Sequence, residues 1–281
     1  MVSNVAMFIF ACALLLNIAF SVWWYRTKRE TAFLNKLFLL LAFSLSTWIV
    51  PVMCIYFVKP ENTSMMYFLD CLMQPGGALC SPLYLCIAIS FTQRFEKPPK
   101  WMAALFVMPV ITVLVAWTNP LHHLYYVEFS VVKSQIVFGP YIYISGLCSY
   151  AYLLAAIACM VTFALRNTWA LYWKQSTLFI LSGLCPLLVS FYATFSGADL
   201  PISATPLSFI VTVVLNGIAI QQLHMLDITP VANNHILEAI SDGYLVLSDS
   251  GLVLNYNKHF ERLFGAEYGV EENRMLSDCV K

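Results

Sequence analysis

Apolar residues form seven long stretches, and Asp70 is the only charged residue within them. A stretch of about 20 mostly apolar residues is long enough to cross the hydrocarbon core of a membrane as a helix. We therefore predict membrane-spanning helices at residues 4–25, 37–58, 65–91, 101–118, 140–165, 175–196 and 204–225. The pattern predicts an all-α membrane protein, a seven-transmembrane helix bundle, which is followed by a polar tail.

Composition supports a membrane protein and excludes several other classes. Of the 281 residues, 60% are hydrophobic and 11% are charged, whereas roughly a quarter of the residues of a soluble domain are charged. Fifteen basic and fifteen acidic residues cancel, so no nucleic-acid partner is predicted. Eight of the nine cysteines lie in apolar stretches without metal-binding spacing, so neither a disulfide framework nor a metal site is predicted.

The basic residues of the short loops predict the orientation of the helices. Nine lie in the loops after the first, third and fifth stretches, whereas only Lys59 and Lys133 lie in the loops on the other side. The nine are Arg26, Lys28, Arg29, Lys36, Arg94, Lys97, Lys100, Arg166 and Lys174. Because cytoplasmic loops carry an excess of Lys and Arg, the N-terminus is expected outside and the tail in the cytoplasm.

Polar residues inside the stretches are the candidates for function, because lipid offers them no hydrogen-bond partner. In 65–91 they recur every three or four residues, on one helical face: Asp70, Gln74, Gly77, Ser81 and Tyr84. This face either lines a pocket that opens outward, with Asp70 near its mouth, or is satisfied by neighbouring helices, with Asp70 reaching the outer membrane surface. Both Pro75 and Pro82 remove a backbone donor there.

Other stretches carry similar patterns. Thr205, Ser208, Thr212 and Asn216 share a face of 204–225 and either join helices or touch a ligand. Ser145, Ser149 and Tyr152 are expected to join helices. Pro51, Pro109 and Pro186 lie inside three further stretches, as hinges or as kinks fixed by packing. In the loop 119–139, His122 and His123 either belong to an aromatic membrane-surface loop or sense pH.

The tail has the pattern of a small α/β segment. Residues 231–241 predict a short helix, 243–247 and 252–256 predict two strands around a tight turn, and Asn257 is placed to cap a following helix. Two strands are too few for an independent sheet, so the tail reads as the beginning of a domain.

Several short motifs occur in a characteristic order along the chain. They are Thr118 to Leu124 (TNPLHHL), Gly139-Pro140, Gly183 to Pro186 (GLCP), Thr205 to Phe209 (TPLSF) and Asp227 to Ala232 (DITPVA). In this order they resemble the seven-transmembrane N-terminal region of bacterial sensor histidine kinases, which also precedes diguanylate cyclase outputs. The tail resembles the start of a PAS domain. One departure is Ala204, where members often carry an acidic residue before the Thr-Pro.

The resemblance implies a sensor domain at 1–225, a linker and signalling helix at 226–241, and an incomplete PAS domain at 242–281. It implies a signal-input module in the bacterial cytoplasmic (inner) membrane, which passes an extracytoplasmic or membrane signal to an output domain, foremost a histidine kinase. The chain itself is expected to hold no catalytic domain. The implied partners are an unknown small-molecule or lipid-like signal, membrane lipids, a second copy in a homodimer and, for a kinase, a response regulator. No cofactor can be named.

The candidate ligand contacts are Asp70, Gln74, Ser81, Tyr84, His123, Thr205 and Ser208, and the candidate signal-transmission residues are Asp227 and Pro230. Two alternatives stay open: the input module of a diguanylate cyclase receptor and a small-solute transporter. A light receptor of the rhodopsin type is excluded, because residues 204–225 contain no lysine for a Schiff base.

Overall fold

The computed structural model describes most of the chain, which divides into two compact units, Met1–Met225 and Leu226–Lys281. The described residues are 2–27, 33–59, 61–93, 95, 97–130, 135–166, 170–195, 208, 211–212, 215–216, 218–219, 242–247, 251, 253–265, 268–270, 274 and 276–279.

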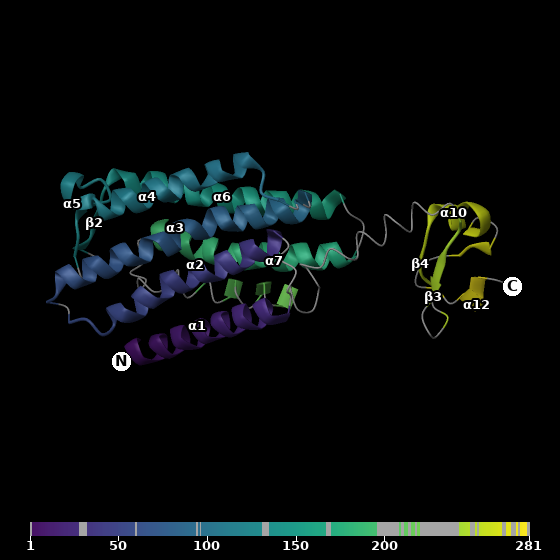
Figure 1. Ribbon diagram of the computed structural model, residues 1–281, viewed down its shortest axis with the longest axis horizontal. Coiled ribbons are helices and arrows are strands. Elements are labelled where there is room, and N and C mark those ends of the chain that lie inside the picture. Colours follow the sequence, from purple (N-terminus) through teal and green to yellow (C-terminus); the bar gives the residue numbers. More distant parts are fainter. Residues whose placement is uncertain are drawn as a thin grey trace. The chain divides into compact units, whose positions relative to one another are not determined.

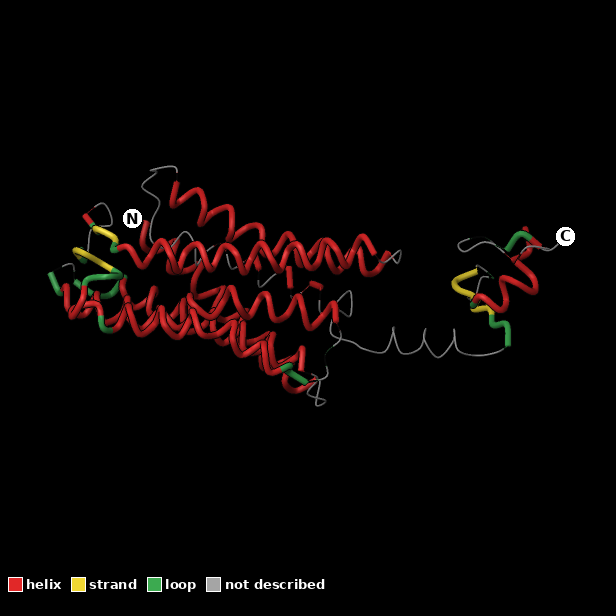
Figure 2. The backbone as a smooth tube through the Cα atoms, turned by 90° about the horizontal axis from the view of Figure 1, so that it is seen from above, coloured by secondary structure: helices red, strands yellow, loops and turns green. Residues whose placement is uncertain are grey.

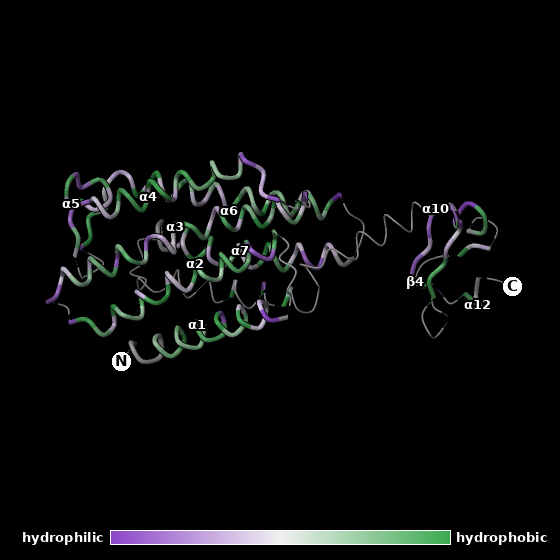
Figure 3. Tube along the Cα trace, in the orientation of Figure 1, coloured by the Kyte–Doolittle hydropathy of each residue, from purple (hydrophilic) through white to green (hydrophobic). Residues whose placement is uncertain are grey.

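The first unit is a bundle of long helices that run alongside one another (Figures 1 and 2). The helices are α1 (Val2–Thr27), α2 (Phe33–Ile55), α3 (Thr63–Gln93), α4 (Val107–Trp117), α6 (Pro140–Arg166) and α7 (Ala170–Phe195). A 3-10 helix, η1 (Lys100–Phe106), runs directly into α4. Figure 3 shows these helices as largely apolar.

Five segments of this unit are long and apolar enough to cross a membrane. They are Phe33–Ile55, Thr63–Gln93, Lys100–Trp117, Pro140–Arg166 and Tyr172–Tyr192, and α1 contains the shorter apolar segment Met7–Trp23. The prediction of a mostly helical, multi-pass membrane protein is thereby confirmed. Most of the predicted stretch 204–225 lies outside the described residues; within it, Ser208, 211–212, 215–216 and 218–219 are helical.

Helix α3 is at the centre of the bundle and packs against α2, α4 and α6. Of the most apolar 18 residues of α3, 56% are buried inside the protein, whereas the corresponding share for α6 is 22%. Gly76 allows α2 to approach closely, because a Cβ there would lie 2.5 Å from the Trp48 backbone nitrogen. The Ser44 hydroxyl uses this proximity to donate to the Gly76 carbonyl at 2.8 Å.

Prolines inside the helices leave backbone carbonyls free, and side chains of other segments bond to two of them. A proline lacks the N–H that would bond the carbonyl four residues earlier. For Pro75 this is the Cys71 carbonyl, which accepts from the Trp117 indole at 2.7 Å. Pro186 likewise frees the Ser182 carbonyl, which accepts from the Thr212 hydroxyl at 2.6 Å. The Leu105 carbonyl, near the end of η1, accepts from the Tyr152 hydroxyl at 3.1 Å.

The connection between α4 and α6 forms a small cap, here called the hairpin cap, on the end of the bundle where α3 begins. It contains the short helix α5 (Asn119–His122) and the antiparallel strands β1 (Tyr126–Glu128) and β2 (Val137–Phe138). The buried Asn119 side chain accepts from the Tyr125 and Tyr126 N–H groups at 2.8 and 3.0 Å and donates to the Tyr126 carbonyl at 2.9 Å. Gly139 closes this cap, because a Cβ there would collide with the Leu124 carbonyl.

The second unit contains the predicted hairpin and capped helix. Strands β3 (Leu245–Leu247) and β4 (Val253–Tyr256) pair antiparallel, and α10 (Lys258–Phe260) continues as a π-helical turn, η3 (Glu261–Gly265). The buried Asn257 caps α10 by accepting from the Phe260 N–H at 2.9 Å, and it also donates to the Asp242 carbonyl at 2.9 Å. A last helix, α12, spans Leu276–Cys279. The predicted helix 231–241 lies outside the described residues.

Candidate functional site

The polar residues predicted on one face of α3 all lie inside the bundle, but in three different surroundings. Asp70 lies beneath the hairpin cap, Gln74 and Ser81 line a cavity, and Tyr84 packs against α7. Asp70 and Ser81 are each 6% exposed and Tyr84 is 2% exposed. Asp70 is therefore buried within the protein, and neither Asp70 nor Tyr84 lines the cavity. Each is held instead by a segment that packs beside it.

Asp70 is held by Tyr126 of the hairpin cap and by Gln74, which in turn bonds to Tyr125 of the same cap. The Tyr126 hydroxyl lies 3.2 and 3.1 Å from the two carboxylate oxygens, and the Gln74 amide donates to one of them at 3.3 Å. The Tyr125 hydroxyl in turn donates to the Gln74 carbonyl oxygen at 2.9 Å. Burial raises the pKa of both tyrosines, so that each stays protonated and remains a donor. The four side chains connect the cap to the wall of the cavity.

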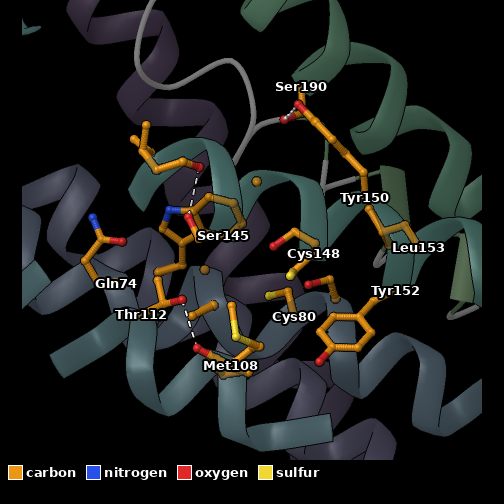
Figure 4. Close-up of a pocket in the computed structure, with 18 of the residues that line it drawn as sticks. Gln74, Cys80, Met108, Thr112, Ser145, Cys148, Tyr150, Tyr152, Leu153 and Ser190 are labelled. Atoms are coloured by element: carbon orange, nitrogen blue, oxygen red, sulfur yellow. Dashed lines mark hydrogen bonds between the residues drawn. The ribbon is translucent and has the colours of Figure 1, made fainter. Parts of the chain in front are cut away.

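The cavity has a volume of about 340 Å³ and lies between α2, α3, α4, α6 and α7 (Figure 4). This volume is within the range of about 300–1,000 Å³ that is typical of small-molecule sites. Its lining combines hydroxyl and amide groups with apolar and aromatic side chains. The polar residues are Gln74, Ser81, Thr112, Tyr125, Ser145, Ser149, Tyr150, Tyr152 and Ser190, and the larger apolar ones are Trp48, Met73, Met108, Pro109, Ile142, Leu153 and Pro186.

Most of the hydroxyl groups around the cavity already have partners within the protein. Thr112 donates to the Met108 carbonyl at 2.9 Å and Ser145 to the Ile142 carbonyl at 3.0 Å, while Tyr150 and Ser190 bond to each other at 3.2 Å. Figure 4 shows these side chains converging on the cavity. The Ser81 hydroxyl differs, because it is buried and has no hydrogen-bond partner in the part of the chain that the structure describes.

Gly146 leaves one wall of the cavity open. Ile142, Gly146, Ser149 and Leu153 follow one another at spacings of four and three residues, so they form the central row of the α6 face that lines the cavity. A Cβ at Gly146 would meet no heavy atom within 4 Å. A side chain placed there would therefore extend into the cavity without displacing the backbone.

Beyond the cavity, Tyr84 joins α3 to α7. Its ring stacks on Phe179 with a centroid distance of 4.2 Å, and its hydroxyl bonds to the Phe179 carbonyl and lies 2.6 Å from the Ser182 hydroxyl. Gly183 makes room for this ring, because a Cβ there would lie 2.8 Å from it.

The same contacts continue from α7 into the described residues of 204–225. Thr212 donates to the Ser182 carbonyl, and the Asn216 amide oxygen lies 3.2 Å from the Ser182 hydroxyl. All three residues are buried. A continuous set of hydrogen-bonded side chains thus leads from α3 through α7 to the last predicted span.

The remaining predicted site residues lie away from the cavity or outside the described residues. His123 is an exposed residue that ends α5 with a left-handed φ of 54°, and it lines a separate shallow groove beside Tyr126. Ser208 is buried and does not line the cavity. Thr205, Asp227 and Pro230 lie outside the described residues. Among the residues that the structure describes, no group of three or more possible ligands could hold a metal.

Several lining residues were not among the predicted ligand contacts. Ser145, Ser149 and Tyr152 had a visible helical spacing and were predicted to join helices. Tyr152 does so through the Leu105 carbonyl, and all three also line the cavity. The contribution of Trp48 and Gly146 had no signal in the sequence, because an aromatic residue and a glycine inside apolar helices are common for reasons of packing alone.

The fold and the cavity define a multi-pass membrane protein with a polar cavity inside its helix bundle. The model of one family, described as the N-terminal 7TM region of histidine kinase, matches residues 7–230. The chain belongs to this family, as the resemblance of its motifs had indicated. No curated protein and no solved structure matches the chain.

Proposed function

We propose that the chain is the membrane-embedded signal-input module of a bacterial sensor histidine kinase, and that its signal molecule binds in the cavity. The observation that carries this proposal is a partly polar cavity between five helices, in a member of this family. Polar side chains inside a membrane bundle are energetically unfavourable, and those that are present commonly mark a functional site. A cavity lined by nine polar residues therefore favours a ligand site over simple packing.

The signal passes from the cavity to the last span through the contacts of α3 with α7. A ligand shifts a conformational equilibrium only if it binds two states with different affinity. Occupation of the cavity favours one position of α3 relative to α7, and the Tyr84–Ser182–Asn216 contacts transmit this difference. From there the movement continues through Asp227 and Pro230 to a PAS domain and the kinase of a two-component system.

The arrangement in the cell follows from the charge bias of the loops. The N-terminus lies outside the cytoplasmic (inner) membrane and the tail lies in the cytoplasm, where the output domain phosphorylates a response regulator. The receptor acts as a homodimer, because two tails that leave paired spans are held at a high effective concentration.

A substitution that fills the cavity tests the proposal in the full-length receptor, in which this region is joined to its output domain. The purified receptor is reconstituted into proteoliposomes, and incorporation of phosphate from radiolabelled ATP is measured. We expect Gly146→Phe to change basal autophosphorylation by at least about fivefold, the lower end of typical allosteric coupling. Leu147→Phe is the matched control, since Leu147 is 70% exposed on the same helix and should leave the activity unchanged.

Two results would contradict the proposal. One is a full-length receptor that incorporates no phosphate under any condition, which would favour a cyclase or transport function. The other is equal basal activity of wild type and Gly146→Phe, together with an equal response to an extract of the cell's own membranes.

A further inference from the structure

The lining of the cavity carries no charge. None of the described residues that line it is Asp, Glu, Lys, Arg or His. The carboxylate of Asp70 bonds to the lining residue Gln74 and does not itself line the cavity, and its oxygens already accept from Tyr126 and Gln74. An ion that entered the cavity would lose its hydration without gaining a counter-ion, so charged molecules are disfavoured.

Ser81 supplies a specific unmet hydrogen bond. Ser81 lines the cavity, and its hydroxyl oxygen is buried and has no partner among the described residues. By contrast, the hydroxyl protons of Thr112, Ser145 and Tyr152 are donated to backbone carbonyls. Since a buried donor without an acceptor is costly, the group that completes this site is one that accepts from Ser81.

The other walls favour an apolar body of moderate size. Trp48, Met73 and Met108 provide flat or deformable apolar surfaces. The volume of about 340 Å³ suits a molecule with one or two rings or a short hydrocarbon chain and is too small for a whole phospholipid.

We propose that the cavity binds an uncharged molecule with an apolar body and a carbonyl oxygen, and that this oxygen accepts a hydrogen bond from the Ser81 hydroxyl. This inference rests on the proposed function, because it names the class of ligand that the sensor site takes. The carbonyl belongs either to a small ketone, ester or lactone that enters the bilayer or to the ester group of a membrane lipid whose end inserts into the cavity.

Photo-crosslinking of the 281-residue protein in nanodiscs tests this class directly. Benzophenone is the probe, because it is an uncharged ketone that forms a covalent bond with nearby C–H groups on illumination. Mass spectrometry of the digested protein is expected to locate the label on peptides that contain Met73 or Met108. Gly146→Phe should reduce this labelling by about tenfold or more, whereas Leu147→Phe should leave it unchanged.

Three competitors with the same arrangement of non-hydrogen atoms separate the chemical classes: benzylacetone with a ketone, hydrocinnamate with a carboxylate, and isopentylbenzene with a methyl group in place of the carbonyl oxygen. At equal mole fractions in the membrane, benzylacetone should displace the probe best. Ser81→Ala should weaken benzylacetone by roughly threefold to tenfold, the size of one neutral hydrogen bond, and leave isopentylbenzene unchanged. Ser81→Ala should not lower the melting temperature of the protein, because the hydroxyl that it removes has no hydrogen-bond partner among the described residues.

The two sources of the carbonyl give different results in different discs. Tighter binding of benzylacetone in ether-linked than in ester-linked phospholipids means that lipid esters compete for the cavity, and equal binding means that a small molecule is the ligand. Both results support the proposed class. Equal competition by hydrocinnamate, or a Ser81→Ala effect that is equal for ketone and hydrocarbon, would overturn it.

The failure of this inference can be told apart from failure of the proposed function. If Gly146→Phe alters autophosphorylation but benzophenone does not label the cavity, the sensor site stands and the ligand class is wrong. If the label is in the cavity and depends on Ser81, but Gly146→Phe leaves the kinase unaffected, the ligand class stands and the signalling role is wrong.

Discussion

The Tyr126 hydroxyl lies between the two carboxylate oxygens of Asp70, at 3.2 and 3.1 Å, and joins the hairpin cap to the second turn of α3. Asp70 is the only charged residue in the predicted membrane stretches and is 6% exposed. A buried carboxylate requires donors, and among the described residues Tyr126 and Gln74 donate to Asp70. The position of the cap and the solvation of Asp70 are therefore coupled.

We expect Tyr126→Phe to lower the free energy of unfolding by about 1.5–3 kcal/mol, the value of a hydrogen bond to a charged group. The ring and its packing against Phe129 and Phe138 stay in place, so the loss reports the hydroxyl alone. Unfolding of the detergent-solubilised protein with a denaturant measures it. Tyr143→Phe is the matched control, since Tyr143 is 66% exposed, and a loss of similar size there would argue against the coupling.

Asn119 holds the backbone of the same hairpin cap at Tyr125 and Tyr126. Asn119→Ala removes an acceptor of two backbone N–H groups and a donor to a backbone carbonyl, so we expect a loss of about 2–3 kcal/mol in stability. Amide hydrogen exchange of residues 125–128 should also become faster in this variant. Leu121→Ala, at a position that is 85% exposed in the same short helix, should change neither quantity. Unchanged exchange in Asn119→Ala would contradict the role assigned to its side chain.

The fold could be predicted from the sequence because its strongest signals are local. Apolar stretches predicted the long helices, and Asn257 predicted the cap of α10. The spacing of Gln74 and Ser81 correctly placed both on an inward face of α3. The motif residues Asn119 and Gly139 were recognised by resemblance alone. Their structural roles depend on the backbone groups that they contact, which the sequence does not specify.

The site could be predicted only in part because a cavity is a property of several helices together. Spacing along α3 could not separate Ser81, which lines the cavity, from Tyr84, whose ring lies in the space that Gly183 leaves on α7. The positions of the prolines indicate which backbone carbonyls lack a partner within their helix. The side chains that donate to these carbonyls, Trp117 and Thr212, come from segments distant in the chain. No local pattern specifies such long-range pairs.

Gly183→Ala tests how tightly α3 and α7 pack. The added methyl group would lie 2.8–3.0 Å from the Tyr84 ring and hydroxyl, so we expect a loss of about 1–3 kcal/mol from overpacking. Circular dichroism during thermal unfolding measures it. In a Tyr84→Leu background the same substitution should cost less, because the obstructing ring is gone. Additive effects of the two substitutions would show that they do not share this space.

The orientation of the bundle can be tested by reporter fusions in living bacteria. Fusions at position 62, before α3, should report an external location, and fusions at position 98, after α3, a cytoplasmic one. The reason is the excess of basic residues in the loops on the side of position 98. The reverse pattern would place the hairpin cap in the cytoplasm and would contradict the proposed direction of signalling.

The pair formed by Thr212 and Pro186 allows the sharpest test of how the last predicted span is joined to α7. Pro186 has no N–H, so the Ser182 carbonyl lacks its partner within the helix and accepts instead from the Thr212 hydroxyl at 2.6 Å. Thr212→Val has almost the same shape but cannot donate, and Thr212 is 1% exposed, so lipid or water cannot replace it. We expect a loss of about 0.6–1.7 kcal/mol, the range measured for hydrogen bonds between membrane helices.

In the Pro186→Ala background, the restored N–H bonds the Ser182 carbonyl from within α7, so Thr212→Val should cost clearly less there. Denaturant unfolding of the four proteins of this double-mutant cycle gives the interaction energy directly. If the freed carbonyl is what holds the last span, the interaction energy approaches the full cost of Thr212→Val in the Pro186 background. An equal cost in both backgrounds would mean that Thr212 acts through packing alone, and the hydrogen-bonded connection from α3 to the last span would then end at α7.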